Sequence, residues 1–238
     1  GYELYYYDGS NTFLVSDYLT GTGSLYPSDL TVCADRLFFT GSIGTGDQLL
    51  CIDTSHNFTE IIVNPSADAS PSNLYSFNNA LFFNANASTT GGTEKRLYKY
   101  DGALTEISID GYANPYPVGF TSYNGMLYFS AKTALYGEEL WRYDGVSAEL
   151  TADIKPGTDS SLPWGLFVYK NRLYLSADDG NGDGRELWYY SQEGMGHFNL
   201  VPGSDGSYPY DEKCEFNGYM FFTAYTTSTN FELWVYRG

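Results

Sequence analysis

The strongest constraint on this chain is a short segment that recurs along its whole length. It reads GEELWRYDG at residues 137–145, and close copies begin at Gly1, Gly184 and Phe231. Weaker copies begin at Asp47 and Glu94, which makes six versions of one expected strand. A fixed period of about 20–50 residues is typical of repeat architectures, in which each unit buries its apolar face only against its neighbours.

Two other parts of the repeat precede the segment. Apolar runs such as LFFTG and LYFSA predict strands buried on both faces. They begin at Leu37, Leu81, Leu127, Leu173 and Met220, at spacings of 44, 46, 46 and 47 residues. Before each run stands a two-residue turn: Ala34-Asp35, Asn78-Asn79, Asn124-Gly125, Lys170-Asn171 and Asn217-Gly218. Such pairs predict hairpins, because both turn positions favour positive φ.

A fourth strand completes each repeat. A turn, often Asp-Gly, follows the ELW-type segment and leads to expected strands at residues 12–15, 59–63, 106–109, 150–154 and 198–201. Four short antiparallel strands per repeat are typical of a propeller blade. We therefore predict an all-β fold, a five-bladed β-propeller of four-stranded antiparallel blades, with residues 1–238 as one domain. An open fragment of a larger ring is the alternative.

The strand count leaves one strand over. Five copies of the other three parts accompany six copies of the ELW-type strand, and both chain ends carry one. One interpretation is a frayed end or a segment cut from a longer array. The other is a terminal strand that pairs with the next molecule by β-augmentation, a head-to-tail contact that builds fibres.

Composition excludes several classes of function. The 238-residue chain has a net charge of -17 and no basic cluster, which argues against nucleic-acid binding. No apolar run reaches the ~18 residues that a membrane helix needs. The chain starts at Gly1 without Met, so we expect a processed or excerpted chain. Cys33, Cys51 and Cys214 form at most one disulfide, match no zinc spacing, and are expected to be buried strand residues.

Repeated aromatic residues are the first candidate binding groups. Equivalent places in the ELW-type strand hold Tyr5, Tyr98, Trp141, Trp188 and Trp234. With the residue two positions on, each forms one aromatic face of its strand. These rings either pack between blades or provide carbohydrate-stacking platforms, roughly one per blade.

A calcium loop is the second candidate. Residues 178–186 read DDGNGDGRE, with oxygen-bearing Asp179, Asn181 and Asp183 at alternate positions followed by Gly184. This is the opening pattern of a Ca²⁺ loop. Position 12 holds Tyr190 rather than glutamate, so Glu186 or Asp178 would supply the missing oxygens. A solvated polar turn is the alternative.

The remaining polar groups are weaker candidates for a functional site. The glutamates before the ELW leucine and the aspartates after it recur once per blade, too far apart for a hydrolytic pair, and the Asp of Asp-Gly is a turn former. Asn57 and Asn86 begin N-x-S/T sequons and are candidate glycosylation sites.

The repeat resembles the ELWxxDGT repeat family of secreted bacterial proteins. The resemblance is carried by GEELWRYDG with LYFSA, and by GRELWYYS with LYLSA and DIKPGTDSSLPWGL at residues 153–166. Ser10, Ala103 and Val146 stand where the family pattern has its final Thr. The resemblance implies an extracellular or cell-surface propeller module and brings no catalytic residues.

Three functions follow, in order of preference. The first is a non-enzymatic structural or adhesive module that self-associates into homo-oligomers or a filament by terminal strand exchange. The second is a lectin that binds glycans through one aromatic site per blade. The third is a glycan-acting enzyme, for which the sequence offers no recognisable carboxylate pair. We expect no cofactor except Ca²⁺, and no membrane insertion.

Overall fold

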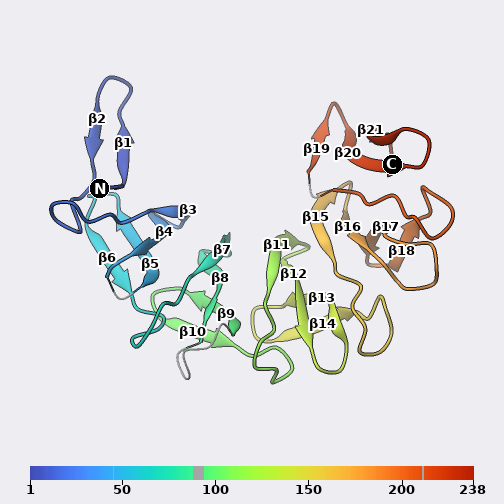
Figure 1. Ribbon diagram of the computed structural model, residues 1–238, viewed down its shortest axis with the longest axis horizontal. Helices are drawn as coiled ribbons and strands as arrows, with labels where there is room; N and C mark the ends of the chain where they lie inside the picture. The colour runs from blue at the N-terminus through green and yellow to red at the C-terminus, as the bar shows by residue number, and fades with distance from the viewer. Residues whose placement is uncertain (45, 88–93, 211) are drawn as a thin grey trace. The chain divides into compact units, whose positions relative to one another are not determined.

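The computed structural model describes residues 1–44, 46–87, 94–210 and 212–238. The described residues form 21 β-strands and no helix, which confirms the all-β prediction. It follows that none of their segments is a helix long and apolar enough to cross a membrane. All strand pairs are antiparallel, and each strand of a sheet pairs with its neighbour in sequence (Figure 1).

The chain divides into two compact units. The first comprises residues 1–107 and 113–116, and the second comprises residues 108–112 and 117–238. Across the described residues there are four sheets of four strands, one of three and one of two. The expected five complete blades are therefore not all present, and the count of five is not confirmed.

The first unit contains three sheets. A two-stranded sheet precedes two four-stranded sheets, whose first strands lie side by side. Their strands are β1 (Tyr5–Tyr7) and β2 (Thr12–Leu14); β3 (Ser28–Cys33), β4 (Arg36–Ser42), β5 (Asp47–Asp53) and β6 (Phe58–Ile61); and β7 (Ser72–Phe77), β8 (Ala80–Asn86), β9 (Lys95–Tyr100) and β10 (Leu104–Ile107).

The second unit contains two four-stranded sheets and a three-stranded one. The first strands of the two four-stranded sheets again lie side by side. The strands are β11 (Val118–Tyr123), β12 (Met126–Thr133), β13 (Gly137–Tyr143) and β14 (Ala148–Ala152); β15 (Trp164–Tyr169), β16 (Arg172–Ala177), β17 (Glu186–Ser191) and β18 (Gly194–Phe198); and β19 (Lys213–Phe216), β20 (Tyr219–Thr226) and β21 (Asn230–Tyr236).

The predicted two-residue turns connect the first and second strands of these sheets. Both turn residues have positive φ in four of the five, as at Asn78 and Asn79, and Ala34 alone has it in the first. The apolar runs form the second strands. Three of them are continuously buried, as predicted, and the run in β4 is buried from Phe38 on, after a half-buried Leu37. The fifth, β20, alternates between buried and half-buried residues, so burial on both faces was wrong for the strand that begins near Met220.

Each complete sheet also contains a bulge that the sequence analysis did not predict. The pairing of the first and second strands shifts register around Asp29, Asn73, Gly119 and Gly165. All four residues have a φ between 55° and 70°. Asn, Asp and Gly are the residues that adopt this left-handed conformation most readily, which explains their presence two positions after a proline.

The linker that enters each following sheet crosses the start of the preceding third strand. There, a carbonyl at the start of the third strand accepts linker N–H groups, two successive ones except at Lys95, which accepts only from Tyr116 because Pro115 has no N–H. The Glu138 carbonyl accepts from Ser161 and Leu162 at 3.1 and 3.2 Å, and the Arg185 carbonyl accepts from Ser207 and Tyr208 at 2.9 and 3.0 Å. The crossing is so close that a Cβ on Gly137 would lie 2.0 Å from the Asp159 carbonyl oxygen. This contact explains why the repeated segment opens with glycine.

A side chain next to that carbonyl also holds the linker. We call the residue directly before the repeated leucine the clamp residue. The buried Glu139 carboxylate accepts hydrogen bonds from the Ile154 and Ser161 N–H groups at 2.8 and 2.9 Å, and from the Ser161 hydroxyl at 2.6 Å. Glu186 accepts equivalent bonds from Leu200, Val201 and Ser207. Burial raises the pKa of both glutamates, and these hydrogen bonds act in the opposite direction.

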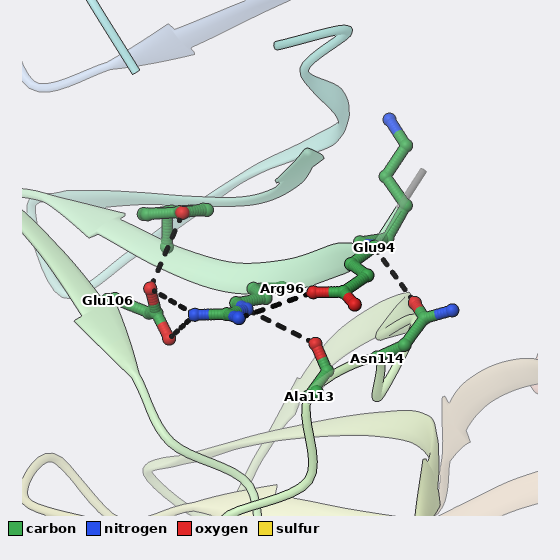
Figure 2. A network of polar contacts seen from close by, with 7 residues as sticks. Glu94, Arg96, Glu106, Ala113 and Asn114 are labelled. Carbon is green, nitrogen blue, oxygen red and sulfur yellow. Dashed lines mark hydrogen bonds and ion pairs between the residues drawn. The ribbon is translucent and has the colours of Figure 1, made fainter. Parts of the chain in front are cut away.

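The clamp residues of the other two complete sheets hold the linker with other functional groups. Gln48 donates from Nε2 to two linker carbonyls at 3.0 Å and accepts from the Val63 N–H at 3.1 Å. Arg96 reverses the polarity by donating to the Ala113 carbonyl at 3.1 Å (Figure 2). Its guanidinium also pairs with Glu106 at 3.0 Å and with Glu94 at 3.4 Å. The side chain at this position therefore contacts the linker in all four complete sheets, whether it is negatively charged, neutral or positively charged.

The clamp also corrects the predicted ends of the fourth strands. The predicted strands extend to Val63, Ile154 and Val201, but the observed strands end earlier, and the strand predicted at residues 198–201 lies at Gly194–Phe198. The N–H groups of these three residues donate to clamp side chains instead of to the sheet. The chain therefore leaves the sheet two or three residues before its apolar pattern ends.

We predict that the clamp contributes strongly to stability. Glu139→Ala leaves buried N–H groups without acceptors and should lower the free energy of unfolding by about 3 kcal/mol. Glu139→Gln should cost less than half of that, because Gln48 shows that an amide can hold a linker. The raised folded-state pKa means that the wild-type advantage over Glu139→Gln is greatest at low pH and declines as the pH rises through that pKa.

Urea denaturation at several pH values measures these differences. The matched control is Glu149→Ala, which removes an exposed carboxylate paired with Arg142 at 3.1 Å and should cost under about 1 kcal/mol. Equal losses for Glu139→Ala and Glu149→Ala would contradict the clamp.

Candidate functional site

The C-terminal sheet has an open edge. β21 is a third strand by its ELW motif and pairs with β20, but no described strand pairs with its other edge. In all four complete sheets the third strand is paired on both sides. An unpaired edge presents free N–H and C=O groups and is a template for another strand.

The same sheet has one open face. Leu233 is 71% exposed, whereas the leucines at the same place in the complete sheets are 0–1% exposed: Leu49, Leu97, Leu140 and Leu187. Within a unit, this leucine shares a buried cluster with the second strand of the following sheet, as Leu140 does with Leu173 and Leu175. Phe231 and Val235, also exposed, lie on the Leu233 face, since successive strand residues point to opposite faces. We call these three residues the open face of β21.

The N-terminal sheet is incomplete in the complementary way. β1 carries the ELW-type motif and β2 is a fourth strand, so this sheet lacks a first and a second strand among the described residues. Leu4 is nevertheless buried, in a cluster with Leu25, Phe39 and Leu50 of the neighbouring sheet. Val32, opposite Leu37 in that neighbouring sheet, is 68% exposed. The hairpin thus covers only part of the surface it packs on.

The clamps of the two terminal copies are not formed. Glu3 has both carboxylate oxygens buried without a hydrogen-bond partner in the described part of the chain. Glu232 is exposed on β21. Among the described residues, only the four copies inside the array hold a linker through the clamp side chain. The first copy holds its linker through the backbone alone, because the Tyr2 carbonyl accepts from the Leu25 and Tyr26 N–H groups at 2.9 and 3.2 Å.

The expected calcium loop lies between β16 and β17. Asp179 accepts hydrogen bonds from the Asn181 backbone and side-chain amides, both at 2.9 Å. The Glu186 carboxylate is instead hydrogen-bonded to the linker as a clamp residue. The described residues contain no group of three or more His, Cys, Asp or Glu side chains placed to hold a metal. Calcium binding by Asp179, Asn181 and Asp183 stays a prediction.

The repeated aromatic residues differ in exposure. Tyr98 and Trp141 are only 6% and 3% exposed, so in this structure they lack the open ring face that sugar stacking requires. Trp188 and Trp234 are half-buried, and the Trp188 ring lies 4.6 Å from the His197 ring. Tyr5 is 54% exposed. The packing interpretation describes the two buried rings, and carbohydrate stacking on the others stays a prediction.

The two sequons lie in different settings. Asn57 is exposed in the turn before β6, where its side-chain amide donates to Asp53 at 2.9 Å. Asn86 is the last residue of β8 rather than a loop residue, and its amide donates to the Asp68 carbonyl at 3.2 Å. Ser88, which completes that sequon, lies outside the described residues. Glycan occupancy stays a prediction at both asparagines.

Comparison with known proteins supports the fold and does not assign a family. No protein-family model matches the chain, and neither does any curated protein. A prolyl endopeptidase structure matches 96% of the chain at 11% identity with a TM-score of 0.61. The β-propeller domain of the Trilobed protease from Pyrococcus furiosus, described as having an open velcro topology, matches 89% at 12% identity with a TM-score of 0.52.

These likenesses show the β-propeller fold alone, because the identities are low. An acylaminoacyl peptidase from Pyrococcus horikoshii matches 84% of the chain at 12% identity, also with a TM-score of 0.52. The chain spans 36% of the prolyl endopeptidase, 65% of the Pyrococcus furiosus domain and 32% of the acylaminoacyl peptidase. Membership of the ELWxxDGT repeat family stays a prediction.

We predict that the folded monomer has one reactive thiol. All three cysteines are free; Cys33 and Cys51 are buried, but Cys214 is exposed, which corrects the expectation that all three are buried. Burial also raises the pKa of Cys51, which lowers its thiolate fraction. Ellman's reagent should modify one thiol per chain at neutral pH and three in urea. Modification of two or more in the folded monomer would contradict the packing described here.

Proposed function

We propose that this chain is a non-enzymatic structural β-propeller module that joins head to tail with further copies of itself. The observation that carries the proposal is the open edge and open face of the C-terminal sheet, with Leu233 at 71% exposure where its counterparts are buried. β21 of one copy pairs with β2 of the next. A contact between two different surfaces does not close on itself, so repeated pairing extends a filament.

A second copy fits the open edge because its β2 already pairs with a strand of the ELW type. Within one copy β2 pairs with β1, whose ELYYY sequence matches ELWVY in β21. The pairs in that hairpin are Tyr5 with Leu14, Tyr6 with Phe13 and Tyr7 with Thr12. If β21 of one copy pairs with β2 of the next in the register of β1, the predicted pairs are Trp234 with Leu14, Val235 with Phe13 and Tyr236 with Thr12. A three-stranded sheet then becomes four-stranded by β-augmentation.

The same exchange covers the apolar surfaces. When β21 occupies the place of β1, Leu233 enters the site that Leu4 fills against Leu25 and Phe39. β19 and β20 accompany β21 and extend over the surface around Val32 that the two-stranded sheet leaves open. Burial of one leucine side chain contributes about 2 kcal/mol, so these contacts favour association over solvent exposure. In the assembly β1 is then unpaired with β2, and it is the surplus ELW-type strand predicted from the sequence.

The setting of the module follows from the resemblance to the ELWxxDGT family, which implies a secreted or cell-surface location. The net charge of -17 makes copies repel one another over long range. Salt screens this repulsion, so assembly is expected to strengthen between low and physiological ionic strength. The buried carboxylates of Glu139 and Glu186 hold linkers, which supports a structural rather than a catalytic use of these groups.

The lectin alternative at the ELW-type aromatic residues is less well supported. It needs equivalent open rings in each blade, and the structure buries Tyr98 and Trp141. The enzyme alternative rests only on distant likeness to peptidases, which concerns the fold.

We predict that Leu233→Lys abolishes assembly without unfolding the monomer. The side chain is 71% exposed in the monomer, so the substitution should change its stability by under about 0.5 kcal/mol. In the assembly the position is buried, and a buried unpaired charge should weaken association by at least about 100-fold. Analytical ultracentrifugation and electron microscopy across protein concentrations measure the change.

The matched control is Val146→Lys, which adds the same charge at a turn residue that is 87% exposed. It should assemble at least as well as the wild type, because any added cation reduces the net negative charge. A wild-type chain that stays monomeric at all concentrations, through closure on itself or with a free end, would refute self-association.

We predict that the register of the contact can be trapped. In a Cys214→Ser background, Phe13→Cys and Val235→Cys face each other across β2 and β21 of neighbouring copies. Oxidation should give a ladder of disulfide-linked multimers on non-reducing gels. Moving one partner by one residue, to Thr12→Cys, points the thiol to the other face of the sheet and should reduce cross-linking strongly. Equal ladders from both pairs would contradict the proposed register.

A further inference from the structure

A cavity outside the terminal sheets has the features of a ligand site. It lies within the unit of residues 117–238, where the linkers that enter β15 and β19 approach each other. Its volume is about 420 Å³, and its apolar wall is formed by Leu162, Pro163, Trp164, Tyr208, Pro209 and Tyr210. Cavities of about 300–1,000 Å³ are typical of small-molecule sites.

The side chains of this wall are exposed although they are large and apolar. Trp164 is 51% exposed, and Tyr208 and Tyr210 are each 46% exposed. The fold does not require an aromatic residue at Trp164 or Tyr210, because the residue after the linker proline is Ser28, Ser72 or Val118 in the other sheets. Tyr208 stands before its proline, as Tyr26 and Tyr116 do in two other linkers. Only two consecutive linkers carry an aromatic residue after the proline, and these two line one cavity. The Tyr210 ring also stacks on Phe231 at 4.7 Å between ring centroids, so the ring that needs an explanation other than packing is that of Trp164.

The cavity is held in shape by hydrogen bonds that fix both linkers. The Arg185 guanidinium donates to the Leu162 carbonyl at 2.8 Å and to the Ser176 carbonyl at 3.0 Å. The Arg185 backbone carbonyl accepts from the Tyr208 N–H at 3.0 Å. Lys213 joins the two walls by donating to the Gly165 carbonyl at 2.9 Å and the Tyr210 carbonyl at 2.6 Å. A preformed wall lowers the entropic cost of binding a ligand.

Polar groups complete the lining. The Glu138 side chain lines the cavity, and its Oε1 accepts a hydrogen bond from the Ser130 hydroxyl at 2.8 Å, which orients the carboxylate. The hydroxyls of Tyr208 and Tyr210 can donate and accept hydrogen bonds. An apolar wall of aromatic rings beside a carboxylate and two phenols matches a molecule with one apolar face and a polar rim.

We propose that this cavity binds a neutral glycan, with one pyranose ring stacked on Trp164. The C–H face of the sugar meets the indole, and its hydroxyl groups donate to Glu138 and exchange hydrogen bonds with the tyrosines. The carboxylate and the net charge of -17 disfavour acidic sugars. The site differs from the ELW-type aromatic positions, and β21 and β2 contribute no residue to its lining. The Tyr210 ring stacks on Phe231 of β21, so the site is tested in the unassembled chain.

Isothermal titration calorimetry of the monomeric Leu233→Lys chain tests the site apart from assembly. The probes are tetrasaccharides of glucose (β-1,4 and α-1,4), N-acetylglucosamine, mannose and xylose, with tetragalacturonate as the acidic comparison. At least one neutral probe should bind with a Kd of about 1 mM or tighter. Trp164→Ala and Tyr208→Ala should each weaken that binding at least about tenfold, since one well-packed ring contributes over about 1 kcal/mol.

Two further variants keep the result interpretable. Trp164→Phe retains a ring and should restore most of the affinity lost in Trp164→Ala, which separates stacking from a folding defect. Phe216→Ala removes a ring that is 71% exposed but outside the cavity, and it should bind as the parent does.

Three outcomes would overturn the proposal. One is the absence of binding by every neutral probe at about 10 mM, which is the weak end of specific recognition. Another is binding that survives Trp164→Ala unchanged. The third is preferential binding of a proline-rich decapeptide, added in parallel because aromatic grooves also take polyproline helices.

Discussion

The contact between each third strand and the linker that crosses it is the interaction on which this architecture depends. A linker that passes from one sheet to the next leaves the hydrogen-bonded ladder, and its buried N–H groups need new acceptors. One strand carbonyl and one clamp side chain provide them, as with the Glu138 carbonyl and the Glu139 carboxylate. In the described chain the clamp is a glutamate, a glutamine or an arginine, so its polarity is matched to each linker separately.

The same linkers join neighbouring sheets through the backbone. The Ser161 N–H donates to the strand before it, and its carbonyl accepts from the Asp178 N–H at the end of β16. Ser207 makes the equivalent pair of bonds with Arg185 and Tyr225. Within a unit, each sheet is thereby fixed to the next, and its leucine-bearing face is covered. A sheet without a following neighbour keeps that face open, which is the condition of β21.

How far the sequence predicts this structure depends on which interactions are local. The turns at Asn78-Asn79 and Asn124-Gly125 follow from backbone preferences of two residues, and the second strands follow from continuous apolar runs. The clamp could not be predicted in this way. Glu139 and Ser161 are 22 residues apart, and a glutamate before a leucine in a strand pattern normally indicates a solvent-facing residue.

The misplaced strand ends have the same origin. The residues near Ile154 and Val201 continue the apolar pattern, but their N–H groups donate to a clamp, which only the folded chain brings near. The candidate sites were missed for a related reason. The ELW-type aromatic residues repeat regularly because the packing of the sheets repeats, so regularity pointed to Trp141, which is buried. The exposed Trp164 breaks the repeat, and in a repeat protein such a departure is the better signal of a specific site.

The linkers explain why a repeated fold can carry a single unrepeated site. Their backbone path is set by the proline, by the left-handed residue before it and by the bonds to the third strand, as at Tyr208 and Pro209. The side chains beside that proline are not needed for the path and are free to vary, as loop residues on a rigid scaffold commonly are. Head-to-tail assembly would then present this one cavity once per copy along a filament. A weak glycan site repeated at a fixed spacing gains avidity from multivalent attachment, so the two proposed features would act together at a glycan-bearing surface.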